Sequence, residues 1–415
     1  MERISVVVPA YNLAPYLGKS LDSLLAQTYP ELEIVVVDDG SQDETPRVIR
    51  DYMEKHPNIR GIFQENGGVT SARLAGAAAA TGDWIGFMDG DDLVEPTMYA
   101  RLLENAQSTG ADISHCGHQI HFPDGRIEYV HQSGKLRTQD HAAGLWELLD
   151  NRQVSLSLCT KLYRRELFQG LSAWMPRDIR YNEDLLMNYY LFDRAKSAVF
   201  EGICPYHYLL RENSASCKGI SEAYIFDPIR VRRLLLERCA PEMKDMCRQA
   251  LLRNLLFNYA QLDVHPKRGE YTEFRHRVRQ MLLAEKESFR LLSTRNRVLA
   301  HMICWAPWSF RLAYGTYVAL FQREQQAVGA RQRLALGGDD AAFKALAAVV
   351  LHGDGDSAAV WRAVGRLHGK AVAKAHAVHA HMLVAGQHEI EVQLAAEAAG
   401  LILGAVGQRL AGFQI

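Results

Sequence analysis

Residues 87–92 read Phe-Met-Asp-Gly-Asp-Asp and place an apolar strand directly against three carboxylates. Asp89 and Asp91 are two residues apart on an extended strand end, so their side chains project to the same side. Oxygen ligands of this kind suit Mg²⁺ or Mn²⁺, which keep several waters and bridge a substrate diphosphate. The segment therefore predicts a divalent-metal site for a nucleotide-activated donor. An acidic turn of this length is also common as plain solvated surface.

Two further strand ends belong with this acidic turn. Residues 4–9 and 33–39 begin as short valine- and isoleucine-rich runs, and residues 15–25 between them carry leucines at helical spacing. This βαβ pattern predicts an α/β fold with a mostly parallel sheet covered on both faces. Ligands of such sheets bind beyond the carboxyl ends of the strands. The first two of these ends hold Pro9, Ala10, Tyr11, Asn12, Asp38 and Asp39.

Five motifs in chain order carry a resemblance to a known family. They lie at residues 8–12, 27–30, 37–43, 66–73 and 88–92. With these motifs the chain resembles the inverting family 2 glycosyltransferases of GT-A fold, and within that family the bacterial enzymes that assemble capsular or exopolysaccharide. The resemblance covers roughly the first half of the chain. It implies a Rossmann-like nucleotide-diphospho-sugar transferase fold, a nucleotide-sugar donor that is expected to be UDP-linked, and Mg²⁺ or Mn²⁺ as cofactor.

The resemblance also implies roles for residues of the donor side. Tyr11 offers an aromatic face to a nucleobase, and Asp39 is expected to accept the N–H of a uracil. Asp39 could instead open a turn and cap the helix that begins near Asp43. Arg73 lies in the first turn of a helix predicted over residues 70–80, where a cation opposes the helix dipole. We therefore expect Arg73 to face the nucleotide or an acidic neighbour, and the alternative is an exposed arginine.

In the acidic turn, the resemblance implies that Asp89 meets the donor ribose or the metal and that Asp91 coordinates the metal. Asp92 is expected as a secondary metal ligand or as a helix cap. In residues 206–216, aromatic or apolar side chains alternate with polar ones, and the segment ends in polar residues. In similar sequences this pattern follows the helix that carries the catalytic base and closes the catalytic domain. Arg211 and Ser214 are expected to touch the diphosphate, because arginine pairs well with phosphate oxygens. An edge strand with a loop is the alternative for this segment.

Transfer by single displacement needs a base for the acceptor hydroxyl. Asn182 is a good N-cap, and the apolar residues after it predict a helix with a buried face. Asp184 then lies in the first turn, where the helix dipole keeps it ionised. An acidic first turn is common without any chemistry. The resemblance implies that Asp184 is the catalytic base and that Glu183 orients the acceptor. Lys161 is expected in a solvated basic turn, and the alternative is that it faces the acceptor.

Composition and chain order predict the domains. We expect a catalytic domain over residues 1–219, with a donor half to about 110 and an acceptor half after it. A helical region is expected over 220–325, and an alanine-, glycine- and histidine-rich appendage of unknown role over 326–415. Residues 286–323 interleave cations with aromatic side chains, which predicts contact with a membrane surface. The alternative for this last segment is a pair of helices packed on the catalytic domain.

The formal net charge of −1 over 415 residues gives no case for a nucleic-acid partner. Seven scattered cysteines without a Cys-x-x-Cys pair, and a first strand that follows Met1 directly, predict a cytoplasmic location. The sequence thus predicts a metal-dependent inverting glycosyltransferase that moves a sugar to a glycan or lipid-linked glycan in cell-surface polysaccharide assembly. The alternatives are a polyprenyl-phosphate sugar synthase and a catalytically silent nucleotide-sugar-binding subunit.

Overall fold

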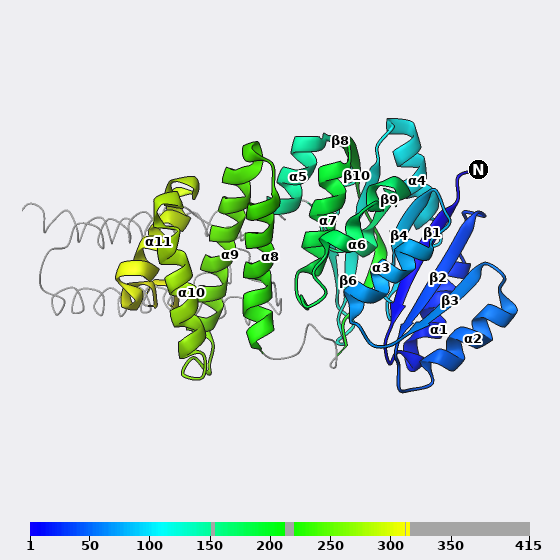
Figure 1. Ribbon diagram of the computed structural model, residues 1–415, viewed down its shortest axis with the longest axis horizontal. Helices are drawn as coiled ribbons and strands as arrows, with labels where there is room; N and C mark the ends of the chain where they lie inside the picture. Colours follow the sequence, from blue (N-terminus) through cyan, green and yellow to red (C-terminus); the bar gives the residue numbers. More distant parts are fainter. Residues whose placement is uncertain (151–153, 212–219, 312, 316–415) are drawn as a thin grey trace, which may run out of the picture. The chain divides into compact units, whose positions relative to one another are not determined.

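A computed structural model of the chain describes residues 1–150, 154–211, 220–311 and 313–315 (Figure 1). The chain divides into two compact units, Met1–Leu251 and Leu252–Ile415. The first unit extends beyond residue 219, because helix α8 (Glu222–Arg238) packs on helix α7 (Glu183–Arg194) within it. The predicted appendage, residues 326–415, lies outside the described residues.

The first unit is built on one sheet, which the sequence predicted as α/β. Ten strands of the described residues join in the order β3-β2-β1-β4-β9-β6-β10-β5, with β7 on β6 and β8 on β10. The strands are β1 (Ile4–Ala10), β2 (Leu32–Asp39), β3 (Ile59–Gln64), β4 (Trp84–Phe87), β5 (Leu93–Val94), β6 (Ile113–His121), β7 (Ile127–Val130), β8 (Leu136–Asp140), β9 (Lys161–Arg164) and β10 (Ser197–Leu209).

Strands β1 to β4 pair in parallel, and β6 pairs in parallel with β10. Strand β9 runs antiparallel between β4 and β6 and so joins the two halves of the sheet. Strand β10 has β6 on one side and β8 and then β5 on the other, so the edge-strand alternative is wrong at Tyr206 and His207, whereas residues 208–209 pair with β6 alone. The parallel half places the ends of β1, β2 and β4 at one edge, as the sequence predicted.

The helices of this unit are α1 (Ala14–Leu25), α2 (Thr45–Lys55), α3 (Val69–Ala79), α4 (Met98–Thr109), α5 (His141–Asp150), α6 (Leu171–Trp174), α7 (Glu183–Arg194) and α8 (Glu222–Arg238). Helices α3 and α4 cover opposite faces of the sheet. Gly76 of α3 lies against Val7, whereas Tyr99 of α4 lies against Gly86, which pairs with Val6. Val6 and Val7 are neighbours on one strand and therefore point to opposite faces.

The region after residue 220 is helical where it is described, as predicted. Its further helices are α9 (Lys244–Val264), α10 (Thr272–Ala284) and α11 (Thr294–Trp305). Among the helices of the described residues, none has the length and apolar character needed to span a bilayer. Within the second unit Phe289 and Phe310 are buried, whereas Trp305 and Trp308 are 55% and 50% exposed. The aromatic residues of the predicted membrane-contact segment therefore divide into an internal set and a surface set.

Candidate functional site

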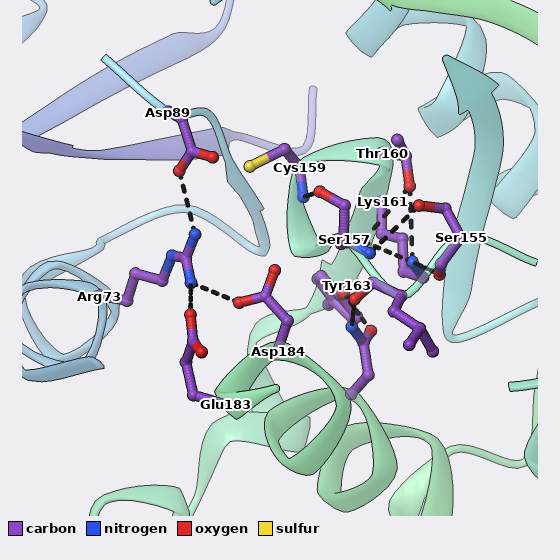
Figure 2. A network of polar contacts seen from close by, with 12 residues as sticks. Arg73, Asp89, Ser155, Ser157, Cys159, Thr160, Lys161, Tyr163, Glu183 and Asp184 are labelled. Atoms are coloured by element: carbon purple, nitrogen blue, oxygen red, sulfur yellow. Dashed lines mark hydrogen bonds and ion pairs between the residues drawn. The ribbon is translucent and has the colours of Figure 1, made fainter. Parts of the chain in front are cut away.

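A buried arginine joins the two halves of the predicted site (Figure 2). Arg73 of α3 is 4% exposed, and its guanidinium contacts three carboxylates. Nη2 lies 3.0 Å from Oδ1 of Asp89, just after β4, and Nη1 lies 3.3 Å from Oε1 of Glu183. Nη1 also donates to Asp184 in the first turn of α7. Of the two expected neighbours for Arg73, the structure shows the acidic one.

The first turn of α7 holds two carboxylates in different environments. Burial raises the pKa of Glu183 to about 8, with the charge of Asp184 adding to the rise and Arg73 opposing it. Glu183 therefore keeps its proton near neutral pH. Asn182 occupies the N-cap with a left-handed φ of 64°, but its side chain makes no capping hydrogen bond. Its Oδ1 instead accepts from Nη1 of Arg232 at 2.8 Å, so the predicted side-chain cap is wrong.

The other two aspartates of the acidic turn point in different directions. Asp91 forms an ion pair with Arg211, whose guanidinium carbon lies 4.0 Å from the ring centre of Tyr16. Asp92 is 1% exposed and is followed by β5, so it does not cap a helix. Tyr206 donates to Asp92 Oδ2 at 2.6 Å. Burial, aided by the charge of Asp89, raises the pKa of Asp92 to about 8.

Asp39 closes the turn that precedes α3. Its Oδ1 accepts from the N–H of Gly67 at 2.9 Å, and its Oδ2 accepts from the N–H of Gly68 at 2.8 Å. Gly68 has a φ of 83°, a conformation that glycine adopts without steric cost. Asp39 does not cap α2, so that alternative is wrong, and its carboxylate sets the entry into the helix that carries Arg73.

The ends of β1 and β2 are tied together beside this turn. The N–H of Asn12 donates to Oγ of Ser41 at 2.9 Å, and the N–H of Gln42 donates to Oδ1 of Asn12 at 2.8 Å. Tyr11 is 48% exposed at the same edge, and Pro9 and Ala10 end β1. The expected donor residues thus share one sheet edge, except Ser214, which lies outside the described residues.

Residues 5–171 match the family model described as glycosyl transferase family 2. The chain contains a family 2 glycosyltransferase domain. EpsJ of Bacillus subtilis (strain 168), described as an uncharacterized glycosyltransferase, is 36% identical over 221 residues, which span 52% of this chain and 63% of EpsJ. The glycosyltransferase GlyG of Streptococcus pneumoniae serotype 4 (strain ATCC BAA-334 / TIGR4) is 28% identical over 305 residues, which span 69% of this chain and 98% of GlyG. The match to EpsJ therefore leaves more than a third of that relative uncovered.

The fold of the family 2 domain also occurs in a solved structure. The crystal structure of S. aureus TarS 1-349 in complex with UDP-GlcNAc superposes with a TM-score of 0.60 at 21% identity, covering 81% of this chain and 94% of that one. This likeness shows the GT-A fold. The family match includes Arg73 and the acidic turn, and it ends before Glu183, Asp184 and Arg211.

Two carboxylates of the family 2 domain have the character of ligands for a divalent cation. The side chains of Asp89 and Asp91 are 36% and 24% exposed, and their oxygens are the ligands that Mg²⁺ and Mn²⁺ prefer. Across the described residues, no group of three or more histidine, cysteine, aspartate or glutamate side chains is arranged to hold a metal ion. A pair of carboxylates still fits a cation that takes its other ligands from water and a diphosphate. In this structure Asp89 is paired with Arg73, and Asp91 is paired with Arg211.

Sequence reasoning missed two residues of this region. Tyr206 reaches both Asp92 and, at 3.3 Å, the N–H of Asp89, and the Tyr-x-Tyr pattern at 206–208 was the available signal. Lys161 is fully buried at the start of β9, so the predicted solvated turn is wrong. No local pattern signals its burial, because its partners lie in a loop without regular spacing.

One hollow of about 1070 Å³ lies away from these residues. It is lined by parts of α4, β6, β7 and β10 and by residues 132–134, with Glu95, Arg101 and Tyr129 among its side chains. None of the predicted site residues lines it. The predicted site residues lie at the strand ends and on α3 and α7, away from this hollow.

Proposed function

We propose that the chain is a metal-dependent inverting glycosyltransferase. It transfers a sugar from a nucleoside diphosphate to a hydroxyl of a glycan or lipid-linked glycan. The observation that carries this proposal is the Arg73 cluster. One guanidinium contacts Asp89, on the donor side, and both Glu183 and Asp184, at the expected base position. Groups held this close are suited to act on two substrates that meet in one place.

Different residues of the chain have different roles in the displacement. The acceptor oxygen forms a bond to the anomeric carbon while the bond from that carbon to the diphosphate oxygen breaks. Asp184 takes the proton of the acceptor hydroxyl. Glu183, which keeps its own proton, orients the acceptor by donating a hydrogen bond. Asp89 and Asp91 are the residues that would hold Mg²⁺ or Mn²⁺, and a cation there offsets charge on the departing diphosphate.

The donor side fits a nucleotide sugar. Tyr11 is exposed at the end of β1 and suits stacking on a nucleobase. Arg211 is suited to the diphosphate, because a guanidinium binds phosphate oxygens with paired hydrogen bonds. TarS, which shares the fold, was crystallised with UDP-GlcNAc, and this supports a UDP-sugar as the first donor to test. Asp39 is occupied by the Gly67–Gly68 turn, so we propose that it shapes the uracil site as well as accepting from the base.

The acceptor is proposed to be lipid-linked, with the second unit at a membrane surface. Trp305 and Trp308 are exposed there. The same segment exposes the cations Lys286, Arg290, Arg297 and Arg311. Exposed tryptophans and cations together suit the headgroup region of an anionic leaflet. An enzyme held at that surface meets a lipid-linked acceptor in two dimensions, and a cytoplasmic location supplies the nucleotide sugar.

The test is a donor screen on the full chain. Release of nucleoside diphosphate from UDP-, GDP- and dTDP-sugars is measured with Mn²⁺ and with chelator, and Asp184→Asn is compared with the native chain. The matched control is Asp193→Asn, which changes an exposed aspartate of the same helix. We expect metal-dependent release from one donor, a loss of about 10³-fold in Asp184→Asn, and native rates in the control.

Other results would point elsewhere. Calorimetric UDP binding without any turnover, with glycan and lipid-linked acceptors both present, would favour the silent nucleotide-sugar-binding subunit. Transfer to polyprenyl phosphate but not to a glycan would favour the sugar-phosphate synthase. No binding of any nucleotide, with or without Mn²⁺, would refute the donor site itself.

A further inference from the structure

Lys161 is a fully buried lysine that has no counter-ion in contact. Its Nζ donates to the carbonyl oxygens of Ser155 and Ser157, at 2.6 Å each, and lies 3.4 Å from Oγ1 of Thr160 (Figure 2). Among the described residues, no carboxylate forms an ion pair with it. A buried ammonium is costly unless its donors are satisfied. Here all three donors are used to hold one short segment, residues 155–160.

Burial also disfavours the charged form of this lysine. Burial lowers the pKa of Lys161 to about 8, and the negative charge of Asp184 opposes the fall. Asp184 is therefore close enough to act on the ammonium, although the two side chains form no ion pair. The lysine sits behind the expected base, on the side opposite to the contact with Arg73 (Figure 2).

A second set of hydrogen bonds connects the same segment to α7. The carbonyl of Leu156 accepts from Nδ2 of Asn188 at 2.8 Å, and Oδ1 of Asn188 accepts from the hydroxyl of Tyr163 at 2.7 Å. Asn188 and Tyr163 are both fully buried. Asn188 lies four residues after Asp184, so the two side chains share one face of the helix. A shift of the segment would therefore pull on the turn that carries the base.

We propose that Lys161 is a positioning residue for the base: its ammonium fixes residues 155–160 and, through Asn188, fixes the turn of α7 that carries Asp184. This inference rests on the proposed role of Asp184. Arg73 holds the base carboxylate from the donor side, and the Lys161–Asn188 connection holds its helix from the acceptor side. Acceptor chemistry then depends on a lysine that touches neither substrate.

The test uses Lys161→Met in the full chain. Methionine keeps the length of the side chain but removes the charge and the three donors. The control is Lys196→Met, which changes an exposed lysine of the same unit. The measurements are kcat and KM for transfer, calorimetric UDP affinity, and hydrogen–deuterium exchange of α7 and α3. We expect kcat to fall about 100-fold with unchanged UDP affinity, and exchange to rise in the first two turns of α7 but not in α3.

The outcomes separate this inference from a purely structural role and from the proposed function. Native kcat and native exchange in Lys161→Met would overturn it, and so would an equal loss of UDP binding and transfer. If Lys161→Met does not fold, Tyr163→Phe decides by the same readouts, since it removes only the hydroxyl that holds Asn188. If the native chain transfers no sugar, the proposed function fails, while the exchange measurement still supports or overturns the positioning.

Discussion

Arg73 is one cation among three carboxylates, and this imbalance governs how the cluster titrates. A guanidinium stays charged in proteins. Burial is the main cause of the raised pKa of Glu183, and repulsion by the neighbouring Asp184 adds to it. One proton on Glu183 leaves Arg73 balanced mainly by Asp89 and Asp184. The cluster thus holds a protonated carboxyl group, that of Glu183, beside a permanent cation.

Replacing Arg73 by lysine tests whether the planar guanidinium group, with its several N–H donors, is needed at this position. A lysine offers one point charge and cannot donate to Asp89 and to α7 with the same paired geometry. We expect Arg73→Lys to lower transfer by about 100-fold and to lower the melting temperature. Steady-state kinetics and thermal unfolding measure the two effects. Unchanged kinetics would mean that charge alone suffices at this position.

The buried His115 makes the folding stability of the chain depend on pH. It is fully buried on β6, where burial, and secondarily the charge of Lys161, lowers its pKa to about 3. The unfolded chain binds a proton on this histidine below about pH 6.5, while the folded chain does not. Stability is therefore complete above that pH and is lost as the pH falls toward 3.

The variant His115→Gln keeps a hydrogen-bond donor for Gln139, which lies 2.6 Å from Nε2 of the histidine. We expect the loss in unfolding free energy between pH 7 and pH 5 to be about 2 kcal/mol smaller in the variant. Denaturant unfolding at the two pH values measures it. The exposed His276 provides the control, His276→Gln. An equal pH dependence in variant and native chain would contradict the prediction.

The sequence located most of these residues but not their partners. Asp184 was predicted in a helical first turn because its neighbours show local spacing, and α7 begins at Glu183. Arg73 and Asp184 are separated by 111 positions, and no local pattern encodes a contact over that distance. Asp39 was expected at a nucleobase, but its two oxygens hold the Gly67–Gly68 turn. Lys161 shows the same limit, because the burial of a charge depends on a loop that has no periodicity.

At the scale of elements, propensity and periodicity were sufficient for β1, β2 and β4 of the parallel half of the sheet, whereas β3 was not predicted. The helix predicted over residues 70–80 is α3, Val69–Ala79. The strands β7 and β8 were not predicted. They are only four and five residues long, and their large apolar side chains, Ile127, Tyr129 and Leu136, are exposed. The interior place of β10 was missed for a different reason. Its neighbours β5 and β8 come from distant parts of the chain.

The packing of α3 on β1 depends on a glycine. A Cβ on Gly76 would lie 2.2 Å from Cγ1 of Val7, so α3 would have to move away from the sheet. We expect Gly76→Ala to lower the unfolding free energy by about 1–3 kcal/mol and to reduce transfer, because Arg73 moves with the helix. Gly269→Ala is the control, since a Cβ there meets nothing within 4 Å. Native stability in Gly76→Ala would show that the helix adjusts without loss.

At the scale of the whole molecule, the surface tryptophans of the second unit predict an association with membranes. We expect the double variant Trp305→Ala, Trp308→Ala to lose flotation with vesicles that contain phosphatidylglycerol, and high salt to weaken flotation of the native chain. Trp146→Ala is the control, because Trp146 is 43% exposed on α5 in the first unit. Equal flotation of the double variant and the native chain would refute surface attachment through this segment.

The Arg73 contacts also restrict how such a protein can be recombined. A chimera joined near residue 110 would take α3 from one parent and α7 from the other, so the arginine and its two α7 carboxylates would come from different genes. If the incoming donor half lacks the arginine, the carboxyl groups of Glu183 and Asp184 lose the cation that they contact, and about 3–5 kcal/mol is the penalty typical of breaking a buried ion pair. Donor preference can therefore be exchanged between relatives only when this one side chain travels with it.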